Sequence, residues 1–124
     1  MLIKIIEPDF IFNDDRGNLT QLVREGYNQV NVITSDANVE RGNHYHKINT
    51  EAFFIISGRL KLELKKDDEE EQYEFKAGDM FVIPPYVIHS FYYYEKTVLV
   101  SMYDKGVELG DGAMDMYKQP SITE

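Results

Sequence analysis

Residues 44–58, His-Tyr-His-Lys-Ile-Asn-Thr-Glu-Ala-Phe-Phe-Ile-Ile-Ser-Gly, contain two of the three histidines of the chain. Strand side chains alternate between two faces, so His44 and His46 point to one side and Tyr45 to the other. Glu51 follows after a gap that suits a tight turn, and its carboxylate can reach the same interior. The third histidine, His89, lies on a distant strand-like segment. Imidazole and carboxylate ligands suit Zn²⁺, Fe²⁺, Mn²⁺, Ni²⁺ or Co²⁺. The spacing therefore predicts a divalent metal site, formed by His44, His46, Glu51 and His89, inside a small β-barrel.

Short strand patterns run from one end of the chain to the other, and no long amphipathic helix pattern interrupts them. The expected strands are residues 2–6, 19–24, 29–34, 40–47, 51–57, 59–66, 71–76, 80–83, 87–94 and 97–103. The clearest alternation places Leu60, Leu62 and Leu64 on a dry face. Gly58 separates this segment from the preceding apolar run, which favours a hairpin with 51–57 and 59–66 as antiparallel neighbours. The fold class is all-β.

The composition describes one globular domain, residues 1–124, with 43% hydrophobic residues and a net charge of -9. The excess of acidic residues argues against nucleic acid as a partner. No cysteine is present, which excludes disulfides and is consistent with a reducing compartment. The first residues do not form a signal peptide, and no run of 18 apolar residues would cross a membrane. We expect a cytoplasmic protein without a membrane partner.

Three segments between or after the strands are expected to be irregular. Residues 67–71 are all acidic, which is typical of a solvated hairpin tip; a second cation site is the alternative. Residues 104–114 contain three glycines and favour a loop or lid. The chain from Lys118 onward is expected to be an exposed tail.

The order and spacing of these residues resemble the cupin superfamily over most of the chain. His44, His46, Glu51 and Gly58 match the intervals of its first motif, and Gly78, Pro84 and His89 match its second. The resemblance implies a double-stranded β-helix, the jelly-roll barrel of cupins, with the metal ligands inside it. Some cupins use the same positions for acid-base chemistry without a metal.

A second resemblance narrows the class to cupins that act on sugar nucleotides. Asp15-Arg16-Gly17 and the stretch from Arg41 to His46 are similar to paired motifs of dTDP-4-dehydrorhamnose 3,5-epimerases, 4-ketosugar 3,4-ketoisomerases and the cupin domain of capsular polysaccharide enzymes. Arg16 and Arg41 are then candidates to bind the diphosphate, because a guanidinium fork matches phosphate oxygens. Ordinary surface ion pairs are the alternative for each arginine.

The chemistry of this class requires a base, an acid and a positive charge near the enolate oxygen. The resemblance places the base at His44, but a ring nitrogen that binds a metal cannot also accept a proton. His44 is therefore either ligand or base. Tyr93, which shares a strand face with His89, and Tyr103 are candidate acids, with aromatic packing as the alternative for both.

The leading hypothesis is a sugar-nucleotide epimerase or ketoisomerase of surface polysaccharide synthesis, with a small-molecule nucleotide sugar as its partner. A metal-dependent Fe²⁺ dioxygenase and a non-catalytic sugar-binding cupin are the alternatives. Cupins commonly pair by exchanging amino-terminal strands. The apolar residues Leu2, Ile3, Ile5 and Ile6 would form an exposed edge if unpaired, so we expect a homodimer.

Overall fold

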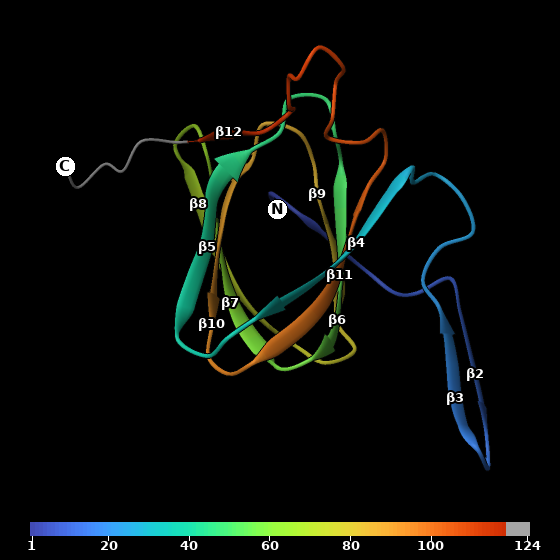
Figure 1. The fold of residues 1–124 in the computed structure, drawn as a ribbon. Coiled ribbons are helices and arrows are strands. Elements are labelled where there is room, and N and C mark those ends of the chain that lie inside the picture. The colour runs from blue at the N-terminus through green and yellow to red at the C-terminus, as the bar shows by residue number, and fades with distance from the viewer. Residues whose placement is uncertain (119–124) are drawn as a thin grey trace.

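Two antiparallel sheets face each other and close into a small barrel (Figure 1). The computed structural model describes residues 1–118, and each sheet has five strands within that range. One sheet has the order β1 (Lys4–Ile6), β9 (Met80–Ile83), β6 (Glu51–Ser57), β11 (Thr97–Tyr103) and β4 (Gln29–Ser35). The other has the order β12 (Tyr117–Lys118), β5 (Val39–Tyr45), β10 (Ile88–Tyr93), β7 (Arg59–Lys66) and β8 (Glu69–Lys76). The predicted all-β jelly-roll barrel is confirmed.

The core lies between the sheets and is built from alternating residues. On β7 the leucines at 60, 62 and 64 are buried, and the residues between them face outward. β10 has the same alternation, with His89, Phe91 and Tyr93 turned inward. The rings of Phe75 and Phe81 stack with centroids 4.3 Å apart. Because both sheets bury one face against the other, the inward side chains of β10 end in the barrel interior.

The expected pairing of residues 51–57 with 59–66 is wrong, because β6 and β7 belong to different sheets. Gly58 carries the chain from one sheet to the other with φ +98. A Cβ at this position would lie 2.3 Å from Thr97 Oγ1 and 2.6 Å from Lys96 O. The glycine between these two apolar runs therefore marks a crossover between the sheets and not a hairpin. Only glycine fits there, because the chain packs against the turn between β10 and β11.

A separate hairpin, β2 (Phe10–Asp14) with β3 (Gly17–Gln21), extends away from the barrel (Figure 1). β2 was not predicted, since its apolar run is only three residues long and ends in Asn13-Asp14. Phe10, Ile11, Phe12 and Leu19 remain about half exposed on the hairpin.

The two ends of the described chain differ from expectation. β1 pairs on one side with β9 of the same chain, and Leu2 and Ile3 are buried. β1 is the first strand of its sheet, so its other side is an edge, where Ile5 remains 52% exposed. Lys118 lies in β12, which pairs with β5, and is not part of an exposed tail. The rest of the expected tail falls outside the described residues.

Two other segments that were expected to be irregular are loops in the structure. Asp67 and Asp68 form the exposed turn between β7 and β8, although Glu69 already begins β8. Residues 104–114 form a loop with one isolated bridge, Glu108 to Met114. Residues 1–118 contain no helix of the length and apolarity that crossing a membrane requires.

Candidate functional site

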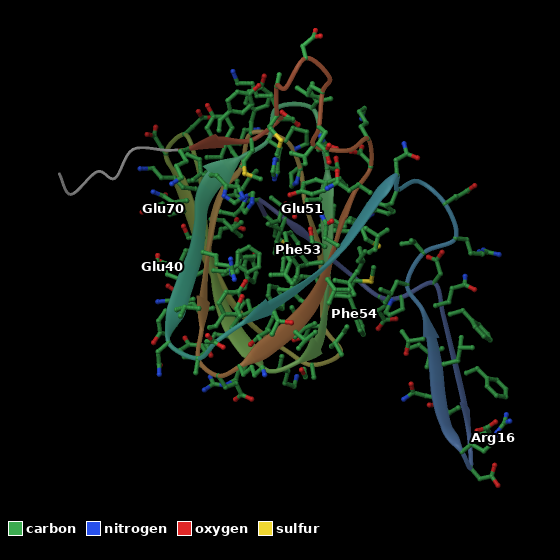
Figure 2. The ribbon with its side chains drawn as sticks, in the orientation of Figure 1. Arg16, Glu40, Glu51, Phe53, Phe54 and Glu70 are labelled. Atoms are coloured by element: carbon green, nitrogen blue, oxygen red, sulfur yellow. The ribbon has the colours of Figure 1, made fainter. Side chains whose placement is uncertain are left out.

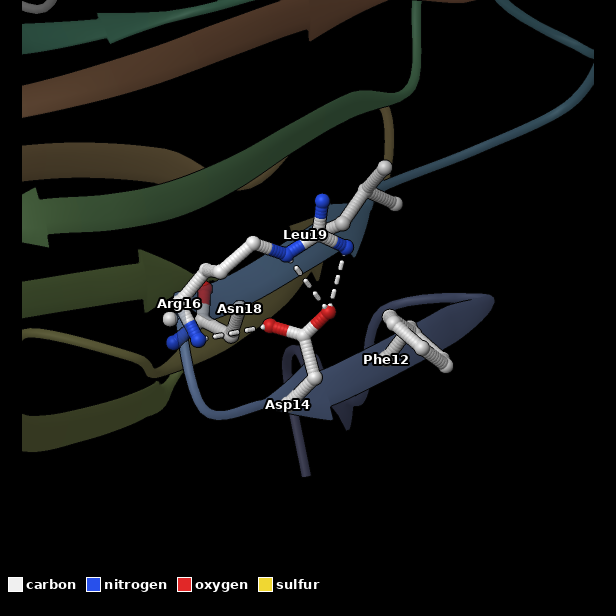
Figure 3. A pocket seen from close by; sticks show the side chains of 6 residues that line it. Phe12, Asp14, Arg16, Asn18 and Leu19 are labelled. Carbon is white, nitrogen blue, oxygen red and sulfur yellow. Dashed lines mark hydrogen bonds and ion pairs between the residues drawn. The ribbon is translucent and has the colours of Figure 1, made fainter.

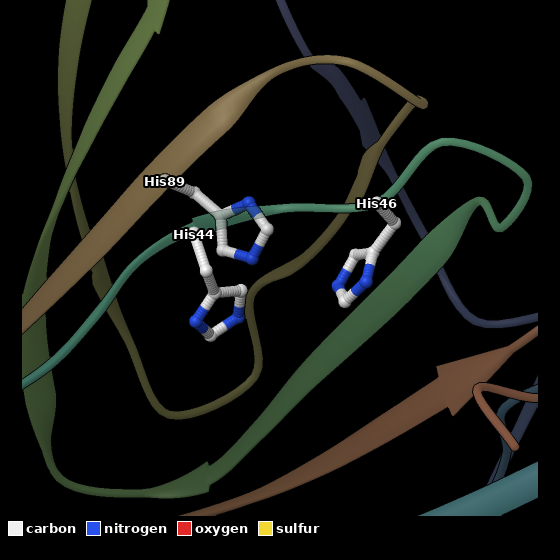
Figure 4. A group of neighbouring side chains, drawn as sticks. All are labelled: His44, His46 and His89. Atoms are coloured by element: carbon white, nitrogen blue, oxygen red, sulfur yellow. The ribbon is translucent and has the colours of Figure 1, made fainter. Parts of the chain in front are cut away.

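Three histidines meet inside the barrel (Figure 4). His44 is on β5, His46 follows the end of that strand, and His89 is on β10 directly opposite His44 in the ladder. Their ring centroids are 4.6 Å apart for His44 and His89, 5.5 Å for His44 and His46, and 5.4 Å for His46 and His89. One ligand nitrogen from each lies within 4.8 Å of the other two. The period-two spacing predicted this convergence.

Hydrogen bonds to the main chain fix the orientation of the two buried rings. Nδ1 of His46 lies 2.6 Å from the carbonyl oxygen of Asp115, and Nδ1 of His89 lies 3.0 Å from that of Val87. A carbonyl only accepts, so each Nδ1 carries the proton. Nε2 of His89 is buried and has no hydrogen-bond partner among the described residues. In a neutral ring this atom presents a lone pair to the interior, which is the state in which histidine binds a metal.

Glu51 is buried beside His46 and His89, and it is also hydrogen-bonded to Ser101 of β11. Its Oε1 lies 3.0 Å from His46 Nε2 and 3.7 Å from His89 Nε2, and its Oε2 accepts a hydrogen bond from Ser101. Figure 2 shows Glu51 and Phe53 pointing into the barrel. Burial alone would raise the pKa of Glu51, but His46, His89 and Ser101 together lower it, so the carboxylate is ionised. Ser101 was missed from sequence, because a serine in an apolar strand carries no spacing signal.

The surroundings shift the pKa values of the three histidines in different directions. Burial lowers the pKa of His44, and the neighbouring His46 lowers it further. Burial likewise lowers the pKa of His89, to about 4. His46 is different: burial opposes its charge, but the hydrogen bond to Glu51 and the Asp115 carbonyl raise its pKa overall. At neutral pH His44 and His89 are therefore uncharged and able to give a lone pair to a proton or a metal.

A cavity of about 450 Å³ opens beside the histidines. Its apolar wall comes from Ile33, Phe53, Phe91 and Leu99. Its polar lining comes from the predicted residues Arg41, His44, Glu51, His89, Tyr93 and Tyr103, and from Lys118. His46 is not part of this lining, so His44 is the more accessible of the two histidines from the first motif.

The two candidate acids both reach this cavity. Burial raises the pKa of Tyr93, which is hydrogen-bonded to Ser35; the hydroxyl of Ser35 also accepts a 2.8 Å bond from Arg41 Nε. Burial and the charge of Glu51 raise the pKa of Tyr103 strongly. Both phenols are therefore protonated at neutral pH and are able to donate a proton.

Arg16 lies elsewhere. It sits at the tip of the β2–β3 hairpin (Figures 2 and 3), with 84% of its side chain exposed, and pairs with Asp14. The hollow it lines is formed by the hairpin itself. The structure of the single chain thus brings Arg41 to the histidines and leaves Arg16 outside that cavity.

The C-terminal segment contributes residues to the candidate site that sequence reasoning missed. We call residues 104–118 the C-terminal strap. Met116 and Lys118 line the cavity, and Asp115 is fully buried beside His46. No spacing rule connects these residues to the histidines, since almost 70 residues separate Asp115 from His46.

A jelly-roll barrel with converging histidines and a buried glutamate near one end defines a cupin. Solved structures support this class. QdtA, a sugar 3,4-ketoisomerase from Thermoanaerobacterium thermosaccharolyticum, is 25% identical with a TM-score of 0.78, and the match covers 96% of this chain and 89% of QdtA. A dTDP-4-dehydrorhamnose 3,5-epimerase from Sulfolobus tokodaii shares the fold at 22% identity and a TM-score of 0.71, covering 83% and 70% of the two chains.

The capsular polysaccharide assembling protein CapF from Staphylococcus aureus also shares the fold, at 23% identity and a TM-score of 0.66; the match covers 90% of this chain but 34% of CapF. The family model of the polysaccharide biosynthesis C-terminal domain matches residues 12–105. This chain belongs to that family.

One curated relative has a different activity. The 3-hydroxyanthranilate 3,4-dioxygenase of Burkholderia cenocepacia is 37% identical over 60 residues, which is 48% of this chain. The match spans about a third of the length of that relative, 34%.

Proposed function

We propose that this chain is a sugar-nucleotide epimerase or ketoisomerase that acts next to a keto group. One observation carries the proposal: a single cavity contains an uncharged imidazole, two protonated phenols and two cationic side chains. The likeness to the sugar 3,4-ketoisomerase over nearly the whole chain supports it.

The reaction uses His44 as the base. Its ring accepts the proton from the carbon beside the carbonyl; the electron pair of that C–H bond forms a C=C double bond to the carbonyl carbon, and the π pair of the carbonyl moves onto its oxygen to give an enolate. A phenol, Tyr93 or Tyr103, supplies a proton. Protonation of the same carbon from the opposite face gives an epimer. Migration of the keto group requires a hydroxyl on that carbon: its proton passes to the enolate oxygen, the former carbonyl carbon is protonated, and the hydroxyl-bearing carbon becomes the new carbonyl. A base that is neutral and an acid that is protonated at the working pH are the states this transfer needs.

Arg41 and Lys118 are proposed to bind the diphosphate of the nucleotide. Both line the cavity, and neither has an ion pair to an acidic side chain within residues 1–118. Arg41 is held by Ser35 and by the carbonyl of Thr34, 3.4 Å away, and both contacts leave its charge uncompensated. On a protein with a net charge of -9, two such cations beside one cavity create a local preference for an anion.

A divalent metal fits the deeper part of the site. The unpartnered Nε2 of His89, the inward Nε2 of His46 and the ionised Glu51 form a donor set of two nitrogens and one carboxylate, which suits Zn²⁺, Fe²⁺, Mn²⁺ or Ni²⁺. When bound, such an ion polarises a carbonyl and stabilises an enolate. The proposal leaves His44 for the proton, because it lines the cavity and is only partly buried, whereas His46, Glu51 and His89 are fully buried.

Hydrogen exchange tests the proposal. A 4-keto TDP sugar incubated with the protein in D₂O should take up deuterium beside the carbonyl, and His44→Ala should abolish the uptake. Tyr86→Phe, an exposed phenol outside the cavity, is the matched control and should leave exchange unchanged. Metal content decides the role of His44: a variant that keeps metal but loses exchange identifies a base, and one that loses both identifies a ligand. Absence of exchange with 4-keto nucleotide sugars in the wild-type protein would refute the function.

A metal-dependent dioxygenase is the second candidate, because of the partial match to 3-hydroxyanthranilate 3,4-dioxygenase. It predicts oxygen consumption on a catechol-like substrate after anaerobic loading with Fe²⁺. The cations Arg41 and Lys118 favour the sugar nucleotide, since an aromatic acid has no diphosphate to occupy both.

We also propose that the protein acts in the cytoplasm as a homodimer in polysaccharide synthesis. Membership of the polysaccharide biosynthesis family supports the pathway. The apolar side chains of the β2–β3 hairpin, together with Val30 and Val32 on the edge strand β4, support the dimer, because all are exposed in the single chain.

A further inference from the structure

Asp115 is fully buried and contacts the loop that connects β5 to β6, both at its first residue, His46, and at the three residues that follow. That loop, residues 46–50, begins at His46 and leads directly into Glu51. Its shape therefore sets the distance between two of the residues proposed to bind the metal.

The carboxylate of Asp115 holds this loop from one side. Its Oδ1 accepts the amide of Lys47 at 2.9 Å, and its Oδ2 accepts the amides of Ile48 at 3.0 Å and Asn49 at 2.9 Å. The side-chain amide of Asn49 donates a further 2.9 Å bond to Oδ2. Three successive backbone amides that point at one carboxylate form an anion-binding nest, and the negative charge strengthens each bond.

The main chain of Asp115 contacts the histidine itself. Its carbonyl oxygen accepts the Nδ1 proton of His46 at 2.6 Å, and its own amide is fixed by the carbonyl of Val107 at 2.8 Å. The carboxylate seated in the loop and the amide bonded to Val107 together hold the carbonyl in this position. One residue thus determines both the tautomer of His46 and the turn that follows it.

Asn49 extends the same anchor into the C-terminal strap. Its Oδ1 accepts the amides of Lys105 at 3.1 Å and Gly106 at 2.9 Å, and its Nδ2 donates to the carbonyl of Gly106 at 2.9 Å. Farther along, the ring of Tyr117 stacks on Tyr45, with centroids 5.5 Å apart. The strap is therefore fastened at two places: at Asn49 in the loop after the histidines, and at Tyr45 between them.

We infer that Asp115 is a positioning residue of the site: its carboxylate seats the strap on residues 47–49, so that its carbonyl holds His46 with Nε2 directed toward Glu51. The inference deepens the proposed function, since it concerns the same site. Its structural part does not depend on a metal being bound, because the bond from His46 Nδ1 to the Asp115 carbonyl is made within the protein itself.

The experiment compares Asp115→Asn and Asp115→Ala with a matched control, Asp104→Asn. Asp104 also caps the loop, since its carboxylate accepts the amide of Thr50 at 2.9 Å, but its other side-chain bond goes to Lys105 rather than to a histidine. Long-range ¹H–¹⁵N spectra of the imidazoles measure the tautomer, and competition with a chromophoric chelator measures zinc affinity.

His46 donates from Nδ1 to the Asp115 carbonyl and from Nε2 to the ionised Glu51, so its metal-free ring carries both protons below its raised pKa. The spectra are therefore recorded at a pH above that pKa, where we expect the neutral ring in the wild-type protein and in Asp104→Asn to keep its proton on Nδ1. In Asp115→Asn the ring should show mixed tautomers, and zinc affinity should fall by about 10- to 100-fold, as is typical when a partner behind a metal ligand is lost. Circular dichroism separates a folded variant from an unfolded one. If Asp115→Ala does not fold, Asp115→Asn, which keeps the size and one acceptor oxygen, decides the outcome.

Two results would overturn the inference: an unchanged His46 tautomer in folded Asp115→Asn, or equal effects of Asp115→Asn and Asp104→Asn on tautomer and affinity. A wild-type protein that binds no zinc but loses its His46 tautomer in Asp115→Asn would refute the proposed metal while upholding the positioning role.

Discussion

Replacement of Gly42 by alanine should damage both the fold and the histidine site. Gly42 pairs with Ser90 across the ladder, where the register shifts between His89 and Ser90, and its φ is +116. A Cβ on Gly42 would lie 2.7 Å from the carbonyl oxygen of His89 and 3.0 Å from the Cα of Ser90. Both are backbone atoms, so no side-chain rotation can relieve the contact.

The magnitude follows from two effects. A carbon and a carbonyl oxygen are comfortable at about 3.3 Å or more, so β10 must move by roughly 0.6 Å at His89. Such overpacking costs about 1–3 kcal/mol, and alanine at positive φ costs about 1–2 kcal/mol more. Together they amount to about 2–5 kcal/mol, a large part of the roughly 5–15 kcal/mol that stabilises a typical domain.

Gly78→Ala is the matched control, because Gly78 has φ +94 but a Cβ at this position would have no heavy atom within 4 Å. Gly78→Ala therefore destabilises the protein only through the unfavourable positive φ of the new alanine. Urea unfolding of both variants should therefore show Gly42→Ala less stable than Gly78→Ala by about 1–3 kcal/mol. Zinc affinity should fall only in Gly42→Ala, since only that change displaces His89. Equal free energies of unfolding for the two variants would refute the reasoning.

Three further perturbations test other parts of the molecule. Lys118→Ala should raise the dissociation constant for TDP severalfold, with a weaker salt dependence by calorimetry, whereas Lys66→Ala, outside the cavity, should not. Glu71 accepts hydrogen bonds from the Leu2 amide and the Tyr73 hydroxyl, which hold its pKa below the usual 4.5. Its stabilising effect is therefore present above pH 4.5 and is lost as the pH falls through the lowered pKa. Glu71→Gln should destabilise the protein at neutral pH and do so less in acid, below that pKa; a difference in unfolding free energy that does not change with pH would contradict this. Phe12→Asp should convert the proposed dimer to monomer in sedimentation velocity, and a wild-type protein that sediments as a monomer would refute the dimer.

The strands and the shared face of His44 and His46 were predictable because both depend on local periodicity, whereas His89 was predictable only from the spacing of the second cupin motif. The alternation of Leu60, Leu62 and Leu64 indicates which face of a strand is dry, and His-x-His indicates that two imidazoles share a face. Neither pattern indicates which strands pair. Residues 51–57 and 59–66 look like a hairpin from sequence, and only the close approach of Gly58 to Thr97 shows that the chain crosses between sheets.

The contacts that complete the site were not predictable for a different reason. Asp115 meets the loop after His46 across 66 to 69 residues, through main-chain groups that every residue possesses. Lys118 reaches the cavity because β12 adds two residues to the edge of β5, and so short a strand has no detectable pattern. Residue type supplies the carboxylate of Asp115 and the charge of Lys118, but only the tertiary structure shows which groups they reach.

The strap links the two halves of the proposed chemistry. Asp115 contacts His46, a ligand of the proposed metal beside the cavity, and three residues later Lys118 supplies a cation to the cavity itself. Strand pairing places Lys118 opposite His44, the proposed base. A nucleotide diphosphate that binds Lys118 therefore contacts the same short segment that sets the imidazole geometry. Binding energy from a part of the substrate that does not react can in this way be used to hold the reacting groups in position.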